Sequence, residues 1–221
     1  MKKSVAVLFG GTGLTGSYLL DLLIKDSSFD SLIVVSRKNL TIRHKKISNR
    51  IIDFSNSKEI EGCIVSDSIV FSCIGTTQSQ VKGDKKKYKE IDFDITLNIA
   101  HACKKLSAKK FLFISSGGAK SSSSNFYLKL KGEIEESVIN TNNNTLFIFK
   151  PSLLIGARKN RRFIEGIGQI LMPLFSYLLP PSIKAVKAST VASAMINFSK
   201  SNLIGVNTIE NKEILNYSLY A

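Results

Sequence analysis

The sequence contains little cysteine, little proline, few acidic residues and no tryptophan. Its three cysteines, Cys63, Cys73 and Cys103, are too few and too widely spaced for a disulfide framework or a four-cysteine metal site. It has no uncharged run of about 18 residues, the length that a membrane-spanning helix needs, and no signal-peptide pattern at its start. We therefore expect a protein of the reducing cytoplasm, without a metal site or a transmembrane segment.

The shortage of acidic residues leaves a formal net charge of +14. Such a charge is typical of proteins that bind nucleic acid or an anionic membrane surface. The lysines are spread along the chain, however, without interleaved aromatic residues or a recognisable nucleic-acid-binding motif. A solvated basic surface is therefore the preferred interpretation, and part of its field would attract a phosphorylated cofactor.

The N-terminal stretch combines a buried-strand pattern, a glycine turn and a helix pattern. Val5 to Phe9 form an apolar run, and an amphipathic helix pattern begins near Tyr18. Between them, Gly10, Gly13 and Gly16 stand three residues apart. In dinucleotide-binding proteins the first glycine permits a tight turn, the second lets the backbone approach the pyrophosphate, and the third lets helix and strand pack closely. The flanking strand and helix favour this interpretation over a glycine-rich turn without a ligand.

The end of the second predicted strand indicates which nucleotide binds. Ser31 to Val35 form a β-branched run that ends in Ser36, Arg37 and Lys38, about 20 residues after the glycine turn. NAD-preferring proteins usually place a carboxylate there, whereas a basic residue accommodates the 2′-phosphate of NADP. A guanidinium also suits a phosphate because its donors form a planar fork. The sequence therefore favours NADP over NAD.

Asp53 and Phe54 follow a short third strand pattern. Two interpretations stay open for them: they flank the adenine of the cofactor, or Asp53 caps the next helix.

The remaining apolar runs complete an alternating pattern of strands and helices. Residues 68–74, 110–114, 145–149 and 205–209 are predicted strands, and Gly75 follows the first of them, where it would let a cofactor ribose approach the backbone. The polar, lysine-rich residues 78–87 predict a surface loop, and periodic apolar residues predict a helix over 88–106. Such an alternation indicates an α/β fold, and 221 residues suit a single compact domain.

A second chemical centre follows the strand at 110–114. Two hydroxyls, Ser115 and Ser116, end the strand, and Tyr127 and Lys131 are spaced four apart on a predicted helix, so they project from one face. A tyrosine works as a general acid or base near neutral pH when a nearby ammonium favours its phenolate. We expect Lys131 to do this while holding the nicotinamide ribose, and a serine hydroxyl to orient the substrate carbonyl.

The last third of the chain contains a basic cluster at 158–162 and an apolar segment at 163–179. The cluster is interpreted either as a solvated loop or as an anion contact at the cofactor mouth. Core or lid packing is the preferred role of the apolar segment, over a dimer contact or an interfacial membrane helix. A helix is predicted at 187–199, and residues 210–214 are assigned to the beginning of a C-terminal tail.

Together these motifs resemble the short-chain dehydrogenase/reductase superfamily, in particular its atypical branch of Tat-interacting-protein oxidoreductase-like proteins. The resemblance covers about nine-tenths of the chain. It is carried by Gly10–Gly16, Ser36–Lys38, Asp53–Phe54, Cys73–Thr77, Ser115–Ala119, Ser124–Glu133, Phe149–Leu154 and Val191–Met195.

The resemblance implies a doubly wound parallel sheet, the Rossmann fold, with a small C-terminal substrate or lid region at about 155–221. It gives Tyr127 the role of proton donor or acceptor, places Lys131 beside the nicotinamide ribose, and assigns the hydroxyl role to Ser116, with Ser115 as the substitute. Asp92 stands where many members of the superfamily have a catalytic asparagine. The residues expected at the cofactor are Gly10, Thr12, Gly13, Leu14, Thr15, Gly16, Arg37, Lys38, Asp53, Phe54, Ile74, Gly75, Thr76, Ser115, Tyr127, Lys131, Pro151, Leu154 and Arg162.

From these features we expect an NADP-dependent oxidoreductase acting on an unidentified carbonyl or alcohol, and we keep a homodimer as a possible assembly. The alternative is an NADPH-binding redox sensor or scaffold that turns nothing over. Nucleic-acid binding is the least favoured function.

Overall fold

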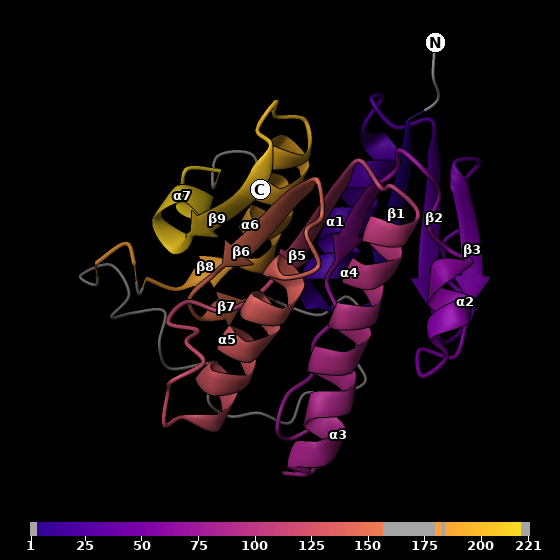
Figure 1. The fold of residues 1–221 in the computed structure, drawn as a ribbon. Coiled ribbons are helices and arrows are strands. Elements are labelled where there is room, and N and C mark those ends of the chain that lie inside the picture. The colour runs from indigo at the N-terminus through magenta and orange to yellow at the C-terminus, as the bar shows by residue number, and fades with distance from the viewer. Residues whose placement is uncertain (1–3, 157–179, 183, 218–221) are drawn as a thin grey trace.

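The computed structural model describes residues 4–156, 180–182 and 184–217. Its centre is a seven-stranded sheet in the order β3-β2-β1-β4-β5-β6-β9, and every pair of neighbouring strands is parallel. This confirms the doubly wound α/β fold (Figure 1). The strands of the sheet are β1 (Val5–Phe9), β2 (Ser31–Ser36), β3 (Ile47–Ile51), β4 (Ile69–Ser72), β5 (Lys110–Ile114), β6 (Thr145–Lys150) and β9 (Gly205–Glu210).

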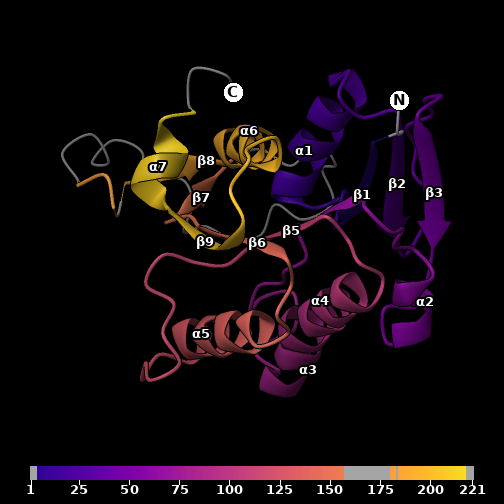
Figure 2. The same ribbon diagram turned by 45° about the horizontal axis from the view of Figure 1, so that its top comes forward.

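Helices cover both faces of the sheet, as parallel connections require. Figure 2 shows α1 and α6 above the sheet and α4 and α5 below it. The helices are α1 (Leu14–Lys25), α2 (Ser57–Glu61), α3 (Lys85–Lys89), α4 (Ile95–Lys105), α5 (Phe126–Ile139), α6 (Ala188–Ser199) and α7 (Asn211–Leu215), with a π-helical turn, η1 (Glu90–Asp94), between α3 and α4.

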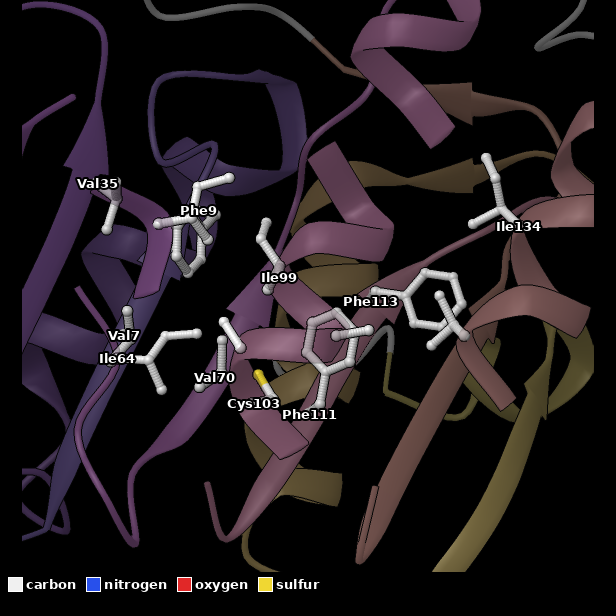
Figure 3. Packing of buried hydrophobic residues seen from close by; sticks show 14 of the residues in the cluster. Val7, Phe9, Val35, Ile64, Val70, Ile99, Cys103, Phe111, Phe113 and Ile134 are labelled. Carbon is white, nitrogen blue, oxygen red and sulfur yellow. The ribbon is translucent and has the colours of Figure 1, made fainter. Parts of the chain in front are cut away.

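Alternation along the strands divides the core into two layers. Val7 and Phe9 of β1 face the α4 and α5 side, where they join Phe111 and Phe113 of β5 (Figure 3). The intervening residues, Ala6 and Leu8, join the cluster beneath α1 and α6. All of these side chains are almost fully buried. The strands are therefore apolar on both faces, which explains the uninterrupted hydrophobic runs in the sequence.

Two of the expectations for the local structure were wrong. The predicted loop at 78–87 becomes helical at Lys85, because the side chain of Asp84 accepts hydrogen bonds from the backbone N–H groups of Lys86 and Lys87. The expected tail beginning at Glu210 is the short helix α7, which starts with a reciprocal hydrogen-bonded cap between Glu210 and Glu213.

Sequence periodicity also missed a second, two-stranded parallel sheet. It consists of β7 (Leu154–Ile155) and β8 (Val186–Lys187). Asn211, the first residue of α7, is 1% exposed and joins α7 to the segments that precede β7 and β8. Its side chain accepts from the backbone of Ser152 and donates to the carbonyls of Pro181 and Lys184.

Candidate functional site

The glycine turn lies where the strand order reverses, between β1 and β4. In open parallel sheets this switch point is where ligands bind, beyond the carboxyl ends of the strands. Gly10 has a φ of +78°, and a Cβ atom there would lie 2.7 Å from the backbone carbonyl of Cys73. A Cβ on Gly16 would lie 2.1 Å from the Gly10 oxygen. Both glycines therefore let the turn, α1 and β4 meet at backbone contact distance.

The first turn of α1 is suited to an anion. Gly13 is the N-cap residue, and neither a capping side chain nor an acidic residue occupies the first turn. The free N–H groups and the helix dipole at such an end favour a phosphate. Thr12 is exposed and Leu14 is half-buried, whereas Thr15 is 5% exposed and packs inward. Contact of these side chains with a cofactor stays a prediction.

Arg37 and Lys38 lie exposed at the carboxyl end of β2. The buried Ser36 fixes the turn beneath them, since its hydroxyl donates to the Lys38 carbonyl at 2.7 Å and accepts from Asn49 at 2.8 Å. Two cations thus stand where a nucleotide 2′-phosphate would lie in a fold of this kind.

Asp53 and Phe54 lie just after β3, and the side chains of both make contacts with neighbouring residues of the protein. Asp53 accepts from the Ser55 N–H at 2.9 Å. The N-cap of α2 is Asn56, so the interpretation of Asp53 as the cap of this helix was wrong. Phe54 is 7% exposed and packs edge-on against Phe9, with ring centroids 6.3 Å apart. Any contact of Phe54 with an adenine would therefore involve its backbone more than its ring.

The segment after β4 comes close to the second chemical centre. Ile74 is half-buried, Gly75 is exposed, and the Thr76 N–H donates to Oδ1 of Asp92 at 2.7 Å. A Cβ on Gly75 would lie 3.8 Å from Oδ2 of Asp92, which is ordinary contact.

The two serines that end β5 differ in their surroundings. Ser115 is 4% exposed, and its hydroxyl donates to Glu135, whose other carboxylate oxygen is 3.0 Å from the Lys150 ammonium. Ser116 is half-buried, and its hydroxyl donates to the adjacent Gly117 carbonyl at 3.3 Å. Ser116 is therefore the serine better able to turn its hydroxyl toward a ligand.

Tyr127 and Lys131 lie on the first two turns of α5, which Asn125 caps by accepting from the Leu128 N–H. The Lys131 ammonium is 5.9 Å from the centre of the Tyr127 ring. It also forms a buried ion pair with Asp92, in which Nζ and Oδ2 are 2.7 Å apart. Burial alone would lower the pKa of Lys131, but interactions with Asp92, Tyr127 and Glu135 together outweigh burial and raise it. The amine therefore stays protonated near neutral pH.

The chain after β6 is hydrogen-bonded to the loop that follows β5. Pro151 is buried, and its carbonyl accepts from the Gly117 N–H at 2.7 Å. Leu154 is half-buried in β7. A hollow of about 200 Å³ lies beside this region, on the α1 and α6 side of the sheet, and is lined by Tyr18, Ile155, Gly156, Lys187, Ala188 and Ser189.

Some predictions fall outside the part of the chain that the structure describes, namely Arg162, the basic cluster at 158–162 and the apolar segment at 163–179. Within the described part, no helix is both long and apolar enough to cross a bilayer. The same residues contain no group of three or more side chains able to hold a metal ion.

The sequence patterns missed the contact partners of the site. Tyr88 was assigned only to a helix, yet its hydroxyl donates to the Thr76 carbonyl at 3.0 Å and its ring packs edge-on against Tyr127. Asp92 stood out only as a departure from the superfamily pattern. Neither contact has a local sequence signal, because each joins segments more than ten residues apart.

Comparison with known proteins agrees with this architecture. A family model described as NAD(P)H-binding matches residues 10–153. Protein HTATIP2 of Rattus norvegicus is 32% identical over 220 residues, which cover 96% of this chain and 88% of that protein. The mitochondrial protein FMP52 of Meyerozyma guilliermondii is 35% identical over 158 residues, covering 70% of this chain and 66% of that protein.

Two solved structures share the fold at low sequence identity. A UDP-N-acetylglucosamine 4-epimerase from Methanobrevibacter ruminantium M1 has a TM-score of 0.71 and 18% identity, over 95% of this chain and 77% of the other. Bordetella bronchiseptica WbmH, in complex with NAD+, has a TM-score of 0.69 and 14% identity, over 94% and 76%. The resemblance inferred from the motifs is confirmed. The glycine turn, the doubly wound sheet and the relatives agree, and the chain belongs to the NAD(P)H-binding family.

Proposed function

We propose that this protein is an NADP-dependent oxidoreductase that interconverts a carbonyl compound and an alcohol. The observation that carries the proposal is the position of Tyr127 and Lys131. They lie side by side on α5, and Lys131 is tied through Asp92 to the backbone of Thr76, in the segment that follows β4 at the switch point. A proton-transfer pair thus adjoins a nucleotide-binding edge.

The residues present fit the dinucleotide in three places. The uncapped first turn of α1 would hold the pyrophosphate, Arg37 and Lys38 would hold the 2′-phosphate, and the exposed Gly75 would lie along the ribose. When bound, the nicotinamide would supply the hydride donor or acceptor. NADP is favoured over NAD because two cations occupy the end of β2.

The protein's own groups would manage the proton and the substrate oxygen. Tyr127 would give the proton in reduction or take it in oxidation, and the charged Lys131 would stabilise the phenolate form of Tyr127 electrostatically. Ser116 would hold the substrate oxygen, since the hydroxyl of Ser115 already donates a hydrogen bond to Glu135. Pro151 and Leu154 would line the nicotinamide side.

The substrate region is proposed to lie in residues 155–221, with Arg162 as a cofactor contact and the segment 163–179 as a lid or a dimer contact. A homodimer is the proposed assembly. The proposed location is the cytoplasm, although relatives such as FMP52 carry the word mitochondrial in their names. Imaging of the tagged protein with compartment markers tests the location.

Calorimetric titration with NADPH and, separately, NADH tests the cofactor. We expect NADPH to bind more tightly, and Arg37→Ala to weaken NADPH binding by about ten- to hundredfold while changing NADH binding little, since a charge-assisted hydrogen bond is lost. Arg43→Ala is the matched control, because Arg43 is also an exposed arginine but lies in the loop before β3. Equal affinities for the two nucleotides, or no binding, would contradict the NADP assignment.

A carbonyl-substrate screen then separates the enzyme from a redox sensor. Turnover that falls by at least about a hundredfold in Tyr127→Phe, with NADPH affinity retained, is the enzyme's signature, since general acid–base catalysis contributes about 10²–10⁴-fold. Tight binding without turnover on a broad carbonyl panel would favour the sensor.

A further inference from the structure

Two pairs of side chains face each other across the helices below the sheet. Tyr88 and Asp92 are four residues apart in the α3–η1 segment, and Tyr127 and Lys131 are four apart on α5. The rings of Tyr88 and Tyr127 pack edge-on, with centroids 6.4 Å apart, and Asp92 pairs with Lys131 at 2.7 Å. The elements α3, η1 and α4 follow one another without a break over residues 85–105 and are called the rod below. Figures 1 and 2 show α5 running beside this rod. One helical pair thus contacts both members of the other.

The same two residues also hold both backbone groups of one residue after β4. Oδ1 of Asp92 accepts from the Thr76 N–H at 2.7 Å, and the Tyr88 hydroxyl donates to the Thr76 carbonyl at 3.0 Å. Both backbone groups of Thr76 are therefore bonded to the rod. Tyr88 and Asp92 thus each contact Thr76 on one side and α5 on the other.

The side chains that make these contacts are buried from solvent. Tyr88 is 2% exposed, Asp92 is 1% exposed and Lys131 is 6% exposed. Both carboxylate oxygens of Asp92 are engaged, one by a backbone N–H and one by an ammonium. An asparagine could accept one of these bonds, but its amide group would present hydrogens to the other donor. The aspartate is therefore specifically suited to join a peptide N–H to a lysine.

Tyr88 is unsuited to be the acid or base itself. Its burial, with a smaller effect from Asp92, raises the pKa of its hydroxyl, so the group stays protonated and donates to Thr76. The π-helical turn at 90–94 contains Asp92, and such turns are frequent at functional sites.

We propose that Tyr88 and Asp92 are positioning residues that lock the cofactor-binding segment at Thr76 and the pair Tyr127–Lys131 into one rigid unit. The inference rests on the proposed function and deepens it, because it names what fixes the proton donor relative to the nucleotide.

The test measures NADPH affinity and the Lys131 ammonium in the full-length protein. Tyr88→Phe removes the bond to Thr76 while keeping the ring, and Asp92→Asn removes the charge. Tyr217→Phe and Glu61→Gln are the matched controls, since the ring of Tyr217 packs on Phe198 and Glu61 pairs with Lys105, both outside the site. Thermal unfolding checks that each variant is folded at the temperature of the titration.

We expect Tyr88→Phe to weaken NADPH binding by about two- to tenfold, the equivalent of one hydrogen bond. Asp92→Asn should weaken binding more and remove the slowly exchanging Lys131 ammonium signal from the nitrogen-15 NMR spectrum. That signal is assigned by its loss in Lys131→Met, and it should persist in Tyr88→Phe and in both controls.

The outcomes separate the inference from the function. If the wild type binds NADPH while Tyr88→Phe and Asp92→Asn match their controls in affinity, the positioning role is overturned, whatever the Lys131 signal, and the function stands. If the wild type binds neither nucleotide, the proposed function is wrong and the inference falls with it. Should Asp92→Asn fail to fold, the affinity of Tyr88→Phe still decides.

Discussion

At the residue scale, the site depends on positions where a single carbon atom cannot be added. Gly16 lies at such a position, because a Cβ there would overlap the Gly10 oxygen, a backbone atom that cannot move without opening the turn. Gly132 is similar, since its Cβ would lie 2.2 Å from the Ser121 nitrogen on the segment that precedes α5. These two contacts set the distances between each helix and the turn beside it.

We expect Gly16→Ala to lower the free energy of unfolding by about 3 kcal/mol, the upper part of the usual range for overpacking, and to abolish NADPH binding because the turn opens. Urea unfolding and calorimetric titration measure the two effects. Gly62→Ala is the control, since its added Cβ would meet only ordinary contacts at 3.6 Å. That variant should match the wild type or gain up to about 1 kcal/mol. An unchanged affinity in a folded Gly16→Ala would contradict the assigned role of the turn.

At the element scale, a buried lysine ties β5 to the end of α6. The Lys110 ammonium donates to the carbonyl of Ser199 at 2.8 Å and to that of Ser201, and it lies 5.7 Å from the centre of the Phe147 ring. Carbonyls at a helix C-terminus have no partner within the helix, and a cation there also complements the helix dipole. Lys110, on the strand β5, thus caps the C-terminus of α6.

Lys110→Met should therefore lower the free energy of unfolding by about 1–3 kcal/mol, because it leaves these carbonyls without their donor. Lys109→Met is the matched control, since Lys109 is the exposed neighbour on the same chain segment. Denaturant unfolding of the two variants should differ by most of that amount. Equal midpoints would show that water replaces the ammonium without loss.

Sequence patterns predicted the strands of the seven-stranded sheet well, and they predicted the helices less completely. Val5–Phe9 and, beyond Lys110, the strand β5 are apolar on both faces because both faces are buried, so their composition alone identified them. The π-turn at 90–94 has no periodic signal, since the apolar face of the rod continues through it from Tyr88 to Ile99. The start of α3 depended on one capping side chain, Asp84, within a run of lysines that favoured a loop.

At the scale of the whole molecule, the α/β fold followed from the glycine turn and the alternating pattern. The contacts that assemble the site did not, because they join distant segments. Tyr127 and Lys131 were found from their spacing of four, whereas the bond from Lys131 to Asp92 spans 39 residues. Ser115 differs from Ser116 because its hydroxyl donates to Glu135, which only the folded chain brings to β5.

The Asp92–Lys131 pair also predicts how the stability of the whole molecule depends on pH. The pKa of Lys131 is raised above its ordinary value of 10.5, so the folded state keeps a proton that the unfolded state loses. The stabilisation is fully present below about pH 10.5 and is lost as the pH rises through the folded-state pKa of Lys131. The self-repulsion that comes with a net charge of +14 falls over the same range, which opposes the effect.

A double variant separates the two contributions. Asp92→Leu combined with Lys131→Met removes both buried charges together, a change that is often neutral or stabilising, and it leaves the net charge unchanged. We expect the free energy of unfolding of the wild type, relative to the double variant, to stay level from about pH 8 to about pH 10 and to fall above about pH 10.5. Urea unfolding across this range measures the difference. A difference that stays level to about pH 11.5 would mean that Lys131 titrates alike in both states, and that Asp92 does not hold its charge.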